Sequence, residues 1–193
     1  MNWTKTLLTA ATLTLAGAAE AADSFKIDPD HTNIVFFVNH LGYATMIGQF
    51  QEFSGQFTFD PAAVESNAVE LTVKTASVDT DQQARDDHLR SPDFFNAAEF
   101  PEMTFKSTSV AKTGDKTGAI TGDLTLLGVT KPVTLTVTFN QLMEHPLPQY
   151  NKVMVAGFSA TTKLSRSEFG MTQFVPYIGD EIEIILEVEG LKM

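Results

Sequence analysis

The chain has 193 residues, with 24 acidic and 13 basic side chains, a formal net charge of −11 and no cysteine. The missing cysteine excludes disulfides, cysteine nucleophiles and cysteine-based zinc sites, and the negative charge argues against nucleic-acid binding, which needs a basic surface. The hydrophobic content of 43% is ordinary for a globular chain of one domain, or of two small ones.

The first 21 residues have the pattern of a cleaved signal peptide. Lys5 supplies a positive charge, the segment 7–17 is apolar, and Ala19-Glu20-Ala21 forms a small-x-small cleavage site. A buried N-terminal helix is the alternative interpretation. We expect cleavage before Ala22, export to the periplasm, and one β-barrel domain over residues 22–193. No later segment approaches eighteen continuous apolar residues, so stable membrane insertion is not expected.

Period-two alternation of apolar and polar residues dominates the rest of the chain and predicts about eight β-strands. Short loops rich in Gly, Asp and Asn connect them and favour antiparallel pairing, because parallel strands need long crossovers. The pattern by itself allows either a closed barrel or a sandwich. The predicted strands lie within residues 34–40, 53–59, 69–73, 103–105, 124–126, 133–139, 158–164 and 182–188.

A short helical insertion near residues 80–98 interrupts the alternation. Thr80 or Asp81 is expected to cap a helix, and Pro92 to open a further turn. If the insertion covers a barrel end, Leu89, Phe94 and Phe95 would form a plug or gate. A dense group of charges in the same segment could either pair internally and fix the insertion to the barrel or bind a ligand; it comprises Arg85, Asp86, Asp87, His88 and Arg90.

Catalytic motifs are not found. There is no Gly-x-Ser-x-Gly elbow, no glycine-rich loop between a strand and a helix, and the histidines at 31, 40, 88 and 145 lack metal-ligand spacing. We therefore predict no enzyme, no catalytic residue and no metal site. Two alternatives stay open: an enzyme or stress-response accessory that modifies a lipid headgroup through the Arg85–Arg90 cluster, and a structural barrel with a filled core.

Four blocks in order carry a family resemblance: HLGYATMIGQF from His40, SVDTDQQARDDHLRSPDFF from Ser77, GDLTLLGVTKPVTLTVTF from Gly122 and LSRSEFG from Leu164. Together they resemble the YceI-like family of bacterial periplasmic polyisoprenoid-binding proteins. The resemblance implies an all-β fold, an extended eight-stranded antiparallel lipocalin-like β-barrel, whose interior holds a quinone tail or polyprenyl chain. It implies a carrier or reservoir that needs no cofactor.

The aromatic composition fits such an interior. The chain has 15 Phe and 3 Tyr, and its single Trp, Trp3, lies in the predicted signal peptide. Phenylalanine lines an apolar tunnel without a polar group that needs a partner. The same residues could also fill a closed core.

Candidate ligand-binding residues come from uniform strand faces and from the family-like blocks. The expected inward residues are Ile34, Phe36, Val38, Phe57, Phe59, Phe105, Leu124, Leu135 and Phe158, with Phe94 and Phe95 as the plug. The expected headgroup contacts are His40, Tyr43, Arg85, Asp86, His88 and Arg166. Arg166 could instead form a strand-end salt bridge, His40 could be structural, and Phe37 is a candidate surface or lid contact. The expected partners are an isoprenoid lipid and, transiently, the inner membrane; the oligomeric state, including a homodimer, is open.

Overall fold

The computed structural model describes residues 22–193, so the predicted signal peptide at residues 1–21 lies outside the described residues. Strands dominate, with one α-helix and four single-turn 3-10 helices among the described residues. The strands are β1 (Asp23–Ile27), β2 (Asn33–His40), β3 (Ala44–Phe50), β4 (Phe53–Phe59), β5 (Ala68–Lys74), β6 (Val78–Asp79), β7 (Glu102–Lys112), β8 (Thr117–Leu126), β9 (Val129–Glu144), β10 (Met154–Ser165) and β11 (Ile178–Lys192). The helices are η1 (Val64–Ser66), η2 (Thr75–Ser77), α1 (Gln83–Arg90), η3 (Pro148–Tyr150) and η4 (Arg166–Phe169).

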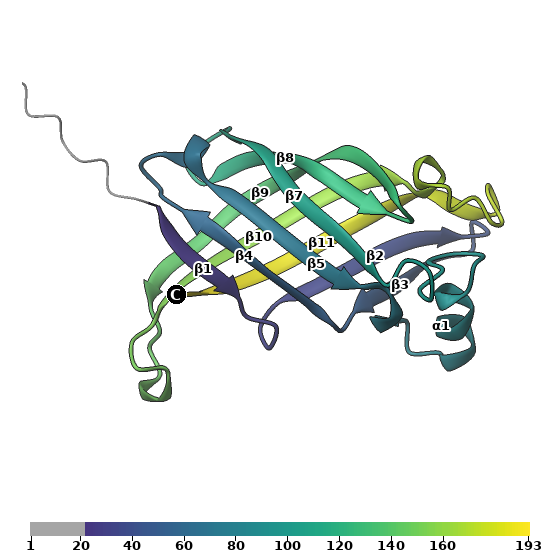
Figure 1. Ribbon diagram of the computed structural model, residues 1–193, viewed down its shortest axis with the longest axis horizontal. Coiled ribbons are helices and arrows are strands. Elements are labelled where there is room, and N and C mark those ends of the chain that lie inside the picture. The colour runs from purple at the N-terminus through teal and green to yellow at the C-terminus, as the bar shows by residue number, and fades with distance from the viewer. Residues whose placement is uncertain (1–21) are drawn as a thin grey trace, which may run out of the picture.

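These strand segments form a closed antiparallel barrel with eight strand positions, because three of the positions are each filled by two consecutive short strands. β1 and β2 both pair with β11 and fill one position, β3 and β4 fill the next, and β5 and β6 fill the third. β7 to β11 complete the circle, each beside its sequence neighbour, and β11 returns to β1 and β2. Figure 1 shows the tilted strands wrapping around an elongated axis. The predicted eight-stranded lipocalin-like barrel is confirmed, and the sandwich alternative is excluded.

Three strands were not predicted. β1 and β6 are short, with 5 and 2 residues. β3 reads ATMIGQF, and its alternation is obscured because Gly48 interrupts the inward row of Met46 and Phe50 while Ile47 points outward beside Phe37. A strand with a glycine on its inward face and a large apolar residue on its outward face gives almost no period-two signal, although its backbone pairing is complete.

The predicted helix is confirmed, but its predicted cap is wrong. Gln82 is the N-cap residue of α1, and its side-chain oxygen accepts a hydrogen bond from the Arg85 backbone N–H at 2.6 Å. Asp81 has a φ of 60°, outside the extended region that an N-cap residue adopts. The Thr80 hydroxyl donates to Asp86 instead. Both expected caps are therefore engaged in the turn that precedes the helix.

Candidate ligand-binding tunnel

An elongated cavity of about 340 Å³ runs inside the barrel. Its lining includes Ile178 and Val188 on β11, which are ten residues apart. At about 3.3 Å per residue this is about 33 Å of strand, or about 25 Å along the axis of a barrel with a strand tilt near 40°. The interior is thus a tunnel and not a filled core.

Three inward glycines help to keep this tunnel open. A Cβ atom at Gly48 would lie 2.2 Å from the ring of Phe36, one at Gly122 would lie 2.5 Å from Phe105, and one at Gly190 would lie 2.4 Å from Phe57. The Phe36 and Phe105 rings therefore lie directly on the backbone of the paired strands β3 and β8, and the Phe57 ring of β4 reaches across β1 to the backbone of β11. Because glycine permits such close approach, these rings can lie close to the wall of the tunnel.

The predicted inward residues all lie along this tunnel. Phe94 and Phe95 line it as well, and so does Arg166. Nine of the 15 phenylalanines belong to the lining: Phe36, Phe50, Phe57, Phe59, Phe94, Phe95, Phe105, Phe139 and Phe158. The nine inward predictions are Ile34, Phe36, Val38, Phe57, Phe59, Phe105, Leu124, Leu135 and Phe158. Their contact with a ligand stays a prediction.

Sequence reasoning missed more of the lining residues than it selected. Most share a strand face with a predicted residue, and strict extension of the same alternation would have found them; Phe50 was missed together with its strand. These residues include Phe50, Val133, Val137, Phe139, Ala160, Ile182, Ile184, Leu186 and Val188.

Five predicted headgroup contacts do not line the tunnel. Tyr43 is 88% exposed on the turn between β2 and β3. His40 ends β2 just beyond the last lining residue of that strand, Val38. Arg85, Asp86 and His88 belong to α1, which lies at one end of the barrel (Figure 1). Each of these helix side chains has a partner in the local fold.

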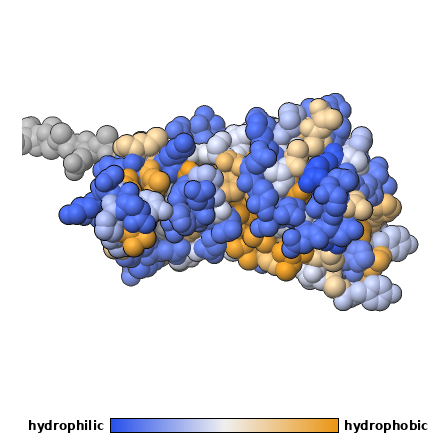
Figure 2. Space-filling view, turned by 90° about the horizontal axis from the view of Figure 1, so that it is seen from below, coloured by the Kyte–Doolittle hydropathy of each residue, from blue (hydrophilic) through white to orange (hydrophobic). Residues whose placement is uncertain are grey.

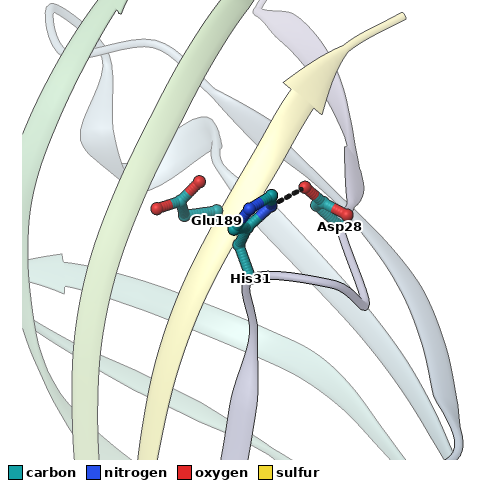
Figure 3. A group of neighbouring side chains, drawn as sticks. All are labelled: Asp28, His31 and Glu189. Atoms are coloured by element: carbon teal, nitrogen blue, oxygen red, sulfur yellow. Dashed lines mark hydrogen bonds and ion pairs between the residues drawn. The ribbon is translucent and has the colours of Figure 1, made fainter.

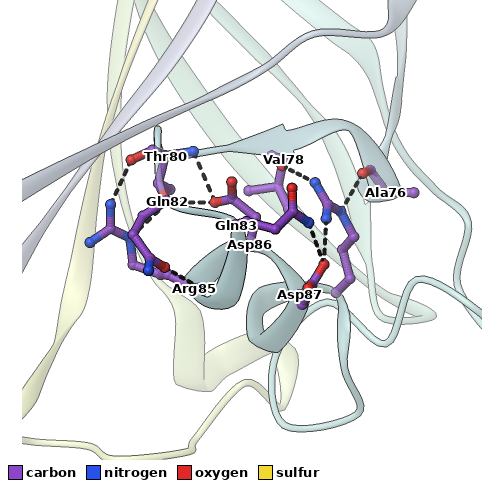
Figure 4. Close-up of polar contacts among 9 residues, drawn as sticks. Ala76, Val78, Thr80, Gln82, Gln83, Arg85, Asp86 and Asp87 are labelled. Carbon is purple, nitrogen blue, oxygen red and sulfur yellow. Dashed lines mark hydrogen bonds and ion pairs between the residues drawn. The ribbon is translucent and has the colours of Figure 1, made fainter.

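The charges of α1 attach the helix to β6 (Figure 4). Buried Asp86 accepts hydrogen bonds from the Thr80 backbone N–H and hydroxyl, and Arg85 donates to the Thr80 carbonyl and hydroxyl. Arg90 donates to the carbonyls of Ala76 and Val78, and it pairs with Asp87 at 3.1 Å. His88 pairs with Asp93 at 2.8 Å. The arrangement favours the structural interpretation of the cluster, because these groups are already satisfied.

The segment after α1 closes this end of the tunnel. Phe94 and Phe95 are 8% and 9% exposed and pack into the main hydrophobic core, with Leu89 beside them. The Phe95 ring meets Phe50 edge to face at 5.4 Å. Their position agrees with the expected plug, and opening of that plug stays a prediction.

Arg166 is 3% exposed and binds backbone carbonyls instead of a carboxylate. Its guanidinium donates to the carbonyl oxygens of Met171, Gln173, Ile178 and Gly179 at 2.8–3.0 Å. Burial lowers the pKa of this guanidinium below its usual value, and Asp180 opposes that shift. The fork of donors holds the loop between β10 and β11 against the barrel. The alternative of a strand-end salt bridge is wrong, because the carboxylate of Asp180 instead bonds to Ser167.

The end of the tunnel away from α1 is more polar. Its lining comes from Pro61 and Val64 near η1 and from Lys112, Asp115 and Lys116 at the hairpin between β7 and β8. Among the described residues that line the tunnel, the charged side chains are those of Lys112, Asp115, Lys116 and Arg166. Sequence reasoning did not select this end, because loop residues carry no periodic signal.

One group of potential metal ligands occurs among residues 22–193. Asp28, His31 and Glu189 place ligand-type atoms within 4.8 Å of one another. His31 Nδ1 and Asp28 Oδ2 are 2.7 Å apart, and Figure 3 shows the imidazole between the two carboxylates. The Thr32 hydroxyl accepts from the Glu189 backbone N–H in the same region. The group thus joins the junction of β1 and β2 to β11 by hydrogen bonds.

This junction predicts a pH dependence of stability. The hydrogen bond to Asp28 raises the pKa of His31 above 6.5, with nearby carboxylates reinforcing it. A raised folded-state pKa means that the stabilisation is full below about pH 6.5 and is lost as pH rises through the folded pKa. Replacing His31 by Asn should therefore lower the free energy of unfolding more at about pH 5.5 than at about pH 8.5. Urea titrations at both pH values measure this. In an Asp28→Asn background the pH-dependent difference should shrink, because only the weaker influence of the other carboxylates remains. An equal loss at both pH values in the wild-type background would contradict the assignment.

Within residues 22–193, no helix has both the length and the apolar character needed to cross a bilayer.

The sequence is similar to that of a known bacterial protein. Protein YceI of Escherichia coli O157:H7 is 43% identical over 179 residues, which cover 92% of this chain and 91% of the relative.

Solved structures agree on the fold. Burkholderia cenocepacia BcnA superposes with a TM-score of 0.76 at 24% identity, over 84% of this chain and 98% of that one. A polyisoprenoid binding domain from Saccharophagus degradans, implicated in plant cell wall breakdown, has a TM-score of 0.66 at 12% identity, over 90% and 100%. The sequence profile of the YceI-like domain matches residues 25–190. The chain therefore belongs to the YceI-like domain family.

Proposed function

We propose that this protein is a periplasmic carrier or reservoir that holds a long isoprenoid lipid, a quinone tail or a polyprenyl chain, in the barrel tunnel. The observation that carries the proposal is the tunnel itself, which is long, narrow and walled almost entirely by aliphatic and phenylalanine side chains. Each five-carbon unit enclosed there contributes about 4 kcal/mol of gross transfer free energy, at about 0.8 kcal/mol per carbon. A few units therefore offset the cost of ordering the chain.

The proposed role is binding without catalysis and without a cofactor. The charged side chains of α1 are engaged in attaching the helix to β6, which leaves them poorly placed for chemistry on a headgroup. The Saccharophagus degradans protein that shares this fold is described as a polyisoprenoid binding domain, which supports the same class of ligand here.

The periplasmic location and the membrane contact belong to this proposal. The pattern of residues 1–21 supports export by a cleaved signal peptide. A water-insoluble isoprenoid resides in a bilayer when it is free, so loading and release require transient contact with the inner membrane.

Mass spectrometry of lipid bound to the native protein tests the proposal. The protein is purified from the periplasm of its own host, extracted with organic solvent, and compared with an extract of an unrelated periplasmic protein. We expect one isoprenoid species enriched in the first extract, and saturable uptake when delipidated protein is titrated with ubiquinone or a polyprenol. If neither a co-purifying lipid nor uptake in titration is observed, the carrier function is wrong.

A further inference from the structure

A group of large apolar and aromatic side chains is exposed at the α1 end of the barrel. It lies on the turn between β2 and β3, on the adjoining part of β3, and on the loop between β10 and β11. We call this group the barrel tip. Its members and their exposed fractions are Leu41 (47%), Tyr43 (88%), Ile47 (57%), Phe174 (47%) and Tyr177 (69%).

The two chain segments that form the barrel tip are uncharged. Residues 38–51 and 169–179 contain no Asp, Glu, Lys or Arg, although these types make up 19% of the chain. Figure 2 shows the larger hydrophobic areas in the middle and at the right of the view, with smaller ones among hydrophilic side chains at the left. Phe37 extends the apolar surface, since it pairs with Ile47 on the outer face of the barrel. An uncharged apolar surface on a chain of net charge −11 indicates a site of interaction with another molecule or with a membrane.

The two loops of the barrel tip are tied to each other through their backbones. The Leu41 backbone N–H donates to the Tyr177 carbonyl at 2.9 Å, which ties the two loops together. Leu41 and Phe174 adopt left-handed backbone conformations, with φ of 56° and 60°. Such conformations are costly for non-glycine residues and persist where the surroundings impose them. The backbone of the two loops is thus fixed at these positions, and the side chains of the barrel tip are exposed on it.

The barrel tip adjoins the closed end of the tunnel. The Phe174 ring lies 6.3 Å from Phe94, which is a tunnel-lining residue, and 6.1 Å from the ring of His88. Ile178 follows directly after Tyr177 and also lines the tunnel. Movement of the plug residue Phe94 would therefore connect the tunnel to the surface formed by the barrel tip.

We infer that the barrel tip docks on the surface of a lipid bilayer and that the isoprenoid passes between bilayer and tunnel there; this inference rests on the proposed carrier function. Tyrosine is the residue type that favours the boundary between headgroups and acyl chains, with its ring in apolar surroundings and its hydroxyl in water. Leucine, isoleucine and phenylalanine beside it can enter the acyl region. A stable interface with a second copy needs about 800 Å² per partner with a polar rim, which a few side chains on two terminal loops do not supply.

Flotation with vesicles tests this surface. The exported protein is mixed with phosphatidylcholine vesicles, and the bound fraction is compared for the wild type, a tip variant (Tyr43→Ser, Ile47→Ser, Tyr177→Ser) and a control variant (Met143→Ser, Leu147→Ser). The control removes side chains that are 42% and 49% exposed at the other end of the barrel. We expect the tip variant to lose about tenfold or more in partitioning and the control to bind as the wild type does. The negative charge also predicts weaker binding when phosphatidylglycerol is added, with salt reducing that difference.

Two further measurements separate the possible failures. Native mass spectrometry with a polyprenol added in detergent measures uptake without vesicles, and the tip variant should take up the lipid as the wild type does. If the wild type fails in this measurement, the carrier function is wrong; if it succeeds while all variants bind vesicles equally or not at all, the docking inference is wrong. Size-exclusion chromatography completes the test, because a dimer that the tip variant alone dissociates would overturn membrane docking in favour of a second copy.

Discussion

Replacing Ala160 by Trp should lower the affinity for an isoprenoid by about 100-fold or more. Ala160 points inward from β10, is 6% exposed, and lies between Val137 and Leu186 on the neighbouring strands, which also line the tunnel. An indole there would occupy the path of the chain. Loss of even one enclosed five-carbon unit removes about 4 kcal/mol of gross transfer energy, and tenfold in affinity corresponds to about 1.4 kcal/mol.

The next residue on β10 provides a matched control. Thr161 is exposed on the outer face of the barrel, beside Thr136 and Ile185. Thr161→Trp should therefore bind the lipid as the wild type does in the same titration. Thermal unfolding gives a second comparison. Overpacking a filled core costs roughly 1–3 kcal/mol of stability, and a tryptophan that enters an existing tunnel avoids most of that cost. Undiminished uptake by Ala160→Trp, or its failure to fold while Thr161→Trp folds, would contradict an open tunnel at this position.

Removing the Arg166 side chain should lower the free energy of unfolding by about 3–5 kcal/mol. Its guanidinium satisfies four backbone carbonyl oxygens between Met171 and Gly179, and Arg166 itself is 3% exposed. In Arg166→Ala these carbonyls lose their donor, and each buried acceptor left unpaired costs about 1–3 kcal/mol before the loop relaxes toward water. The loss also releases the loop between β10 and β11.

Two further variants show whether the guanidinium fork is responsible. Arg166→Lys should recover only part of the stability, because one ammonium cannot reach carbonyls on several sides. Lys163→Ala, three residues earlier in the chain on β10, removes an exposed ion pair with Glu181 and should cost less than about 1 kcal/mol. Urea unfolding monitored by circular dichroism measures all three variants. A loss of about 1 kcal/mol or less in Arg166→Ala would show that solvent, and not the guanidinium, satisfies the loop carbonyls.

The tunnel was accessible to sequence reasoning because a barrel wall imposes one periodicity on every strand. Alternation placed Ile34, Phe36 and Leu135 on inward faces, and the structure has them there. Ala160 shows where the reasoning stopped: it shares a strand face with Phe158, and extending the selection by two residues along that face would have included it in the tunnel lining. The headgroup predictions had no periodicity behind them. The side chains of Asp86 and Arg85 are committed to Thr80, a contact that depends on how α1 folds against β6.

The sequence by itself determined the class of fold, because alternation and short loops leave antiparallel closure as one of few arrangements that bury one face of each strand. It also determined that the interior is apolar. Whether that interior is full or hollow was decided by tertiary packing: the rings of Phe36, Phe105 and Phe57 lie against glycines on other strands, at Gly48, Gly122 and Gly190. Tertiary structure likewise decided that Arg166 donates hydrogen bonds to the loop between β10 and β11, and that the Leu41 N–H donates to the Tyr177 carbonyl at the barrel tip. Such contacts join residues without regard to their spacing in sequence, so no local pattern encodes them.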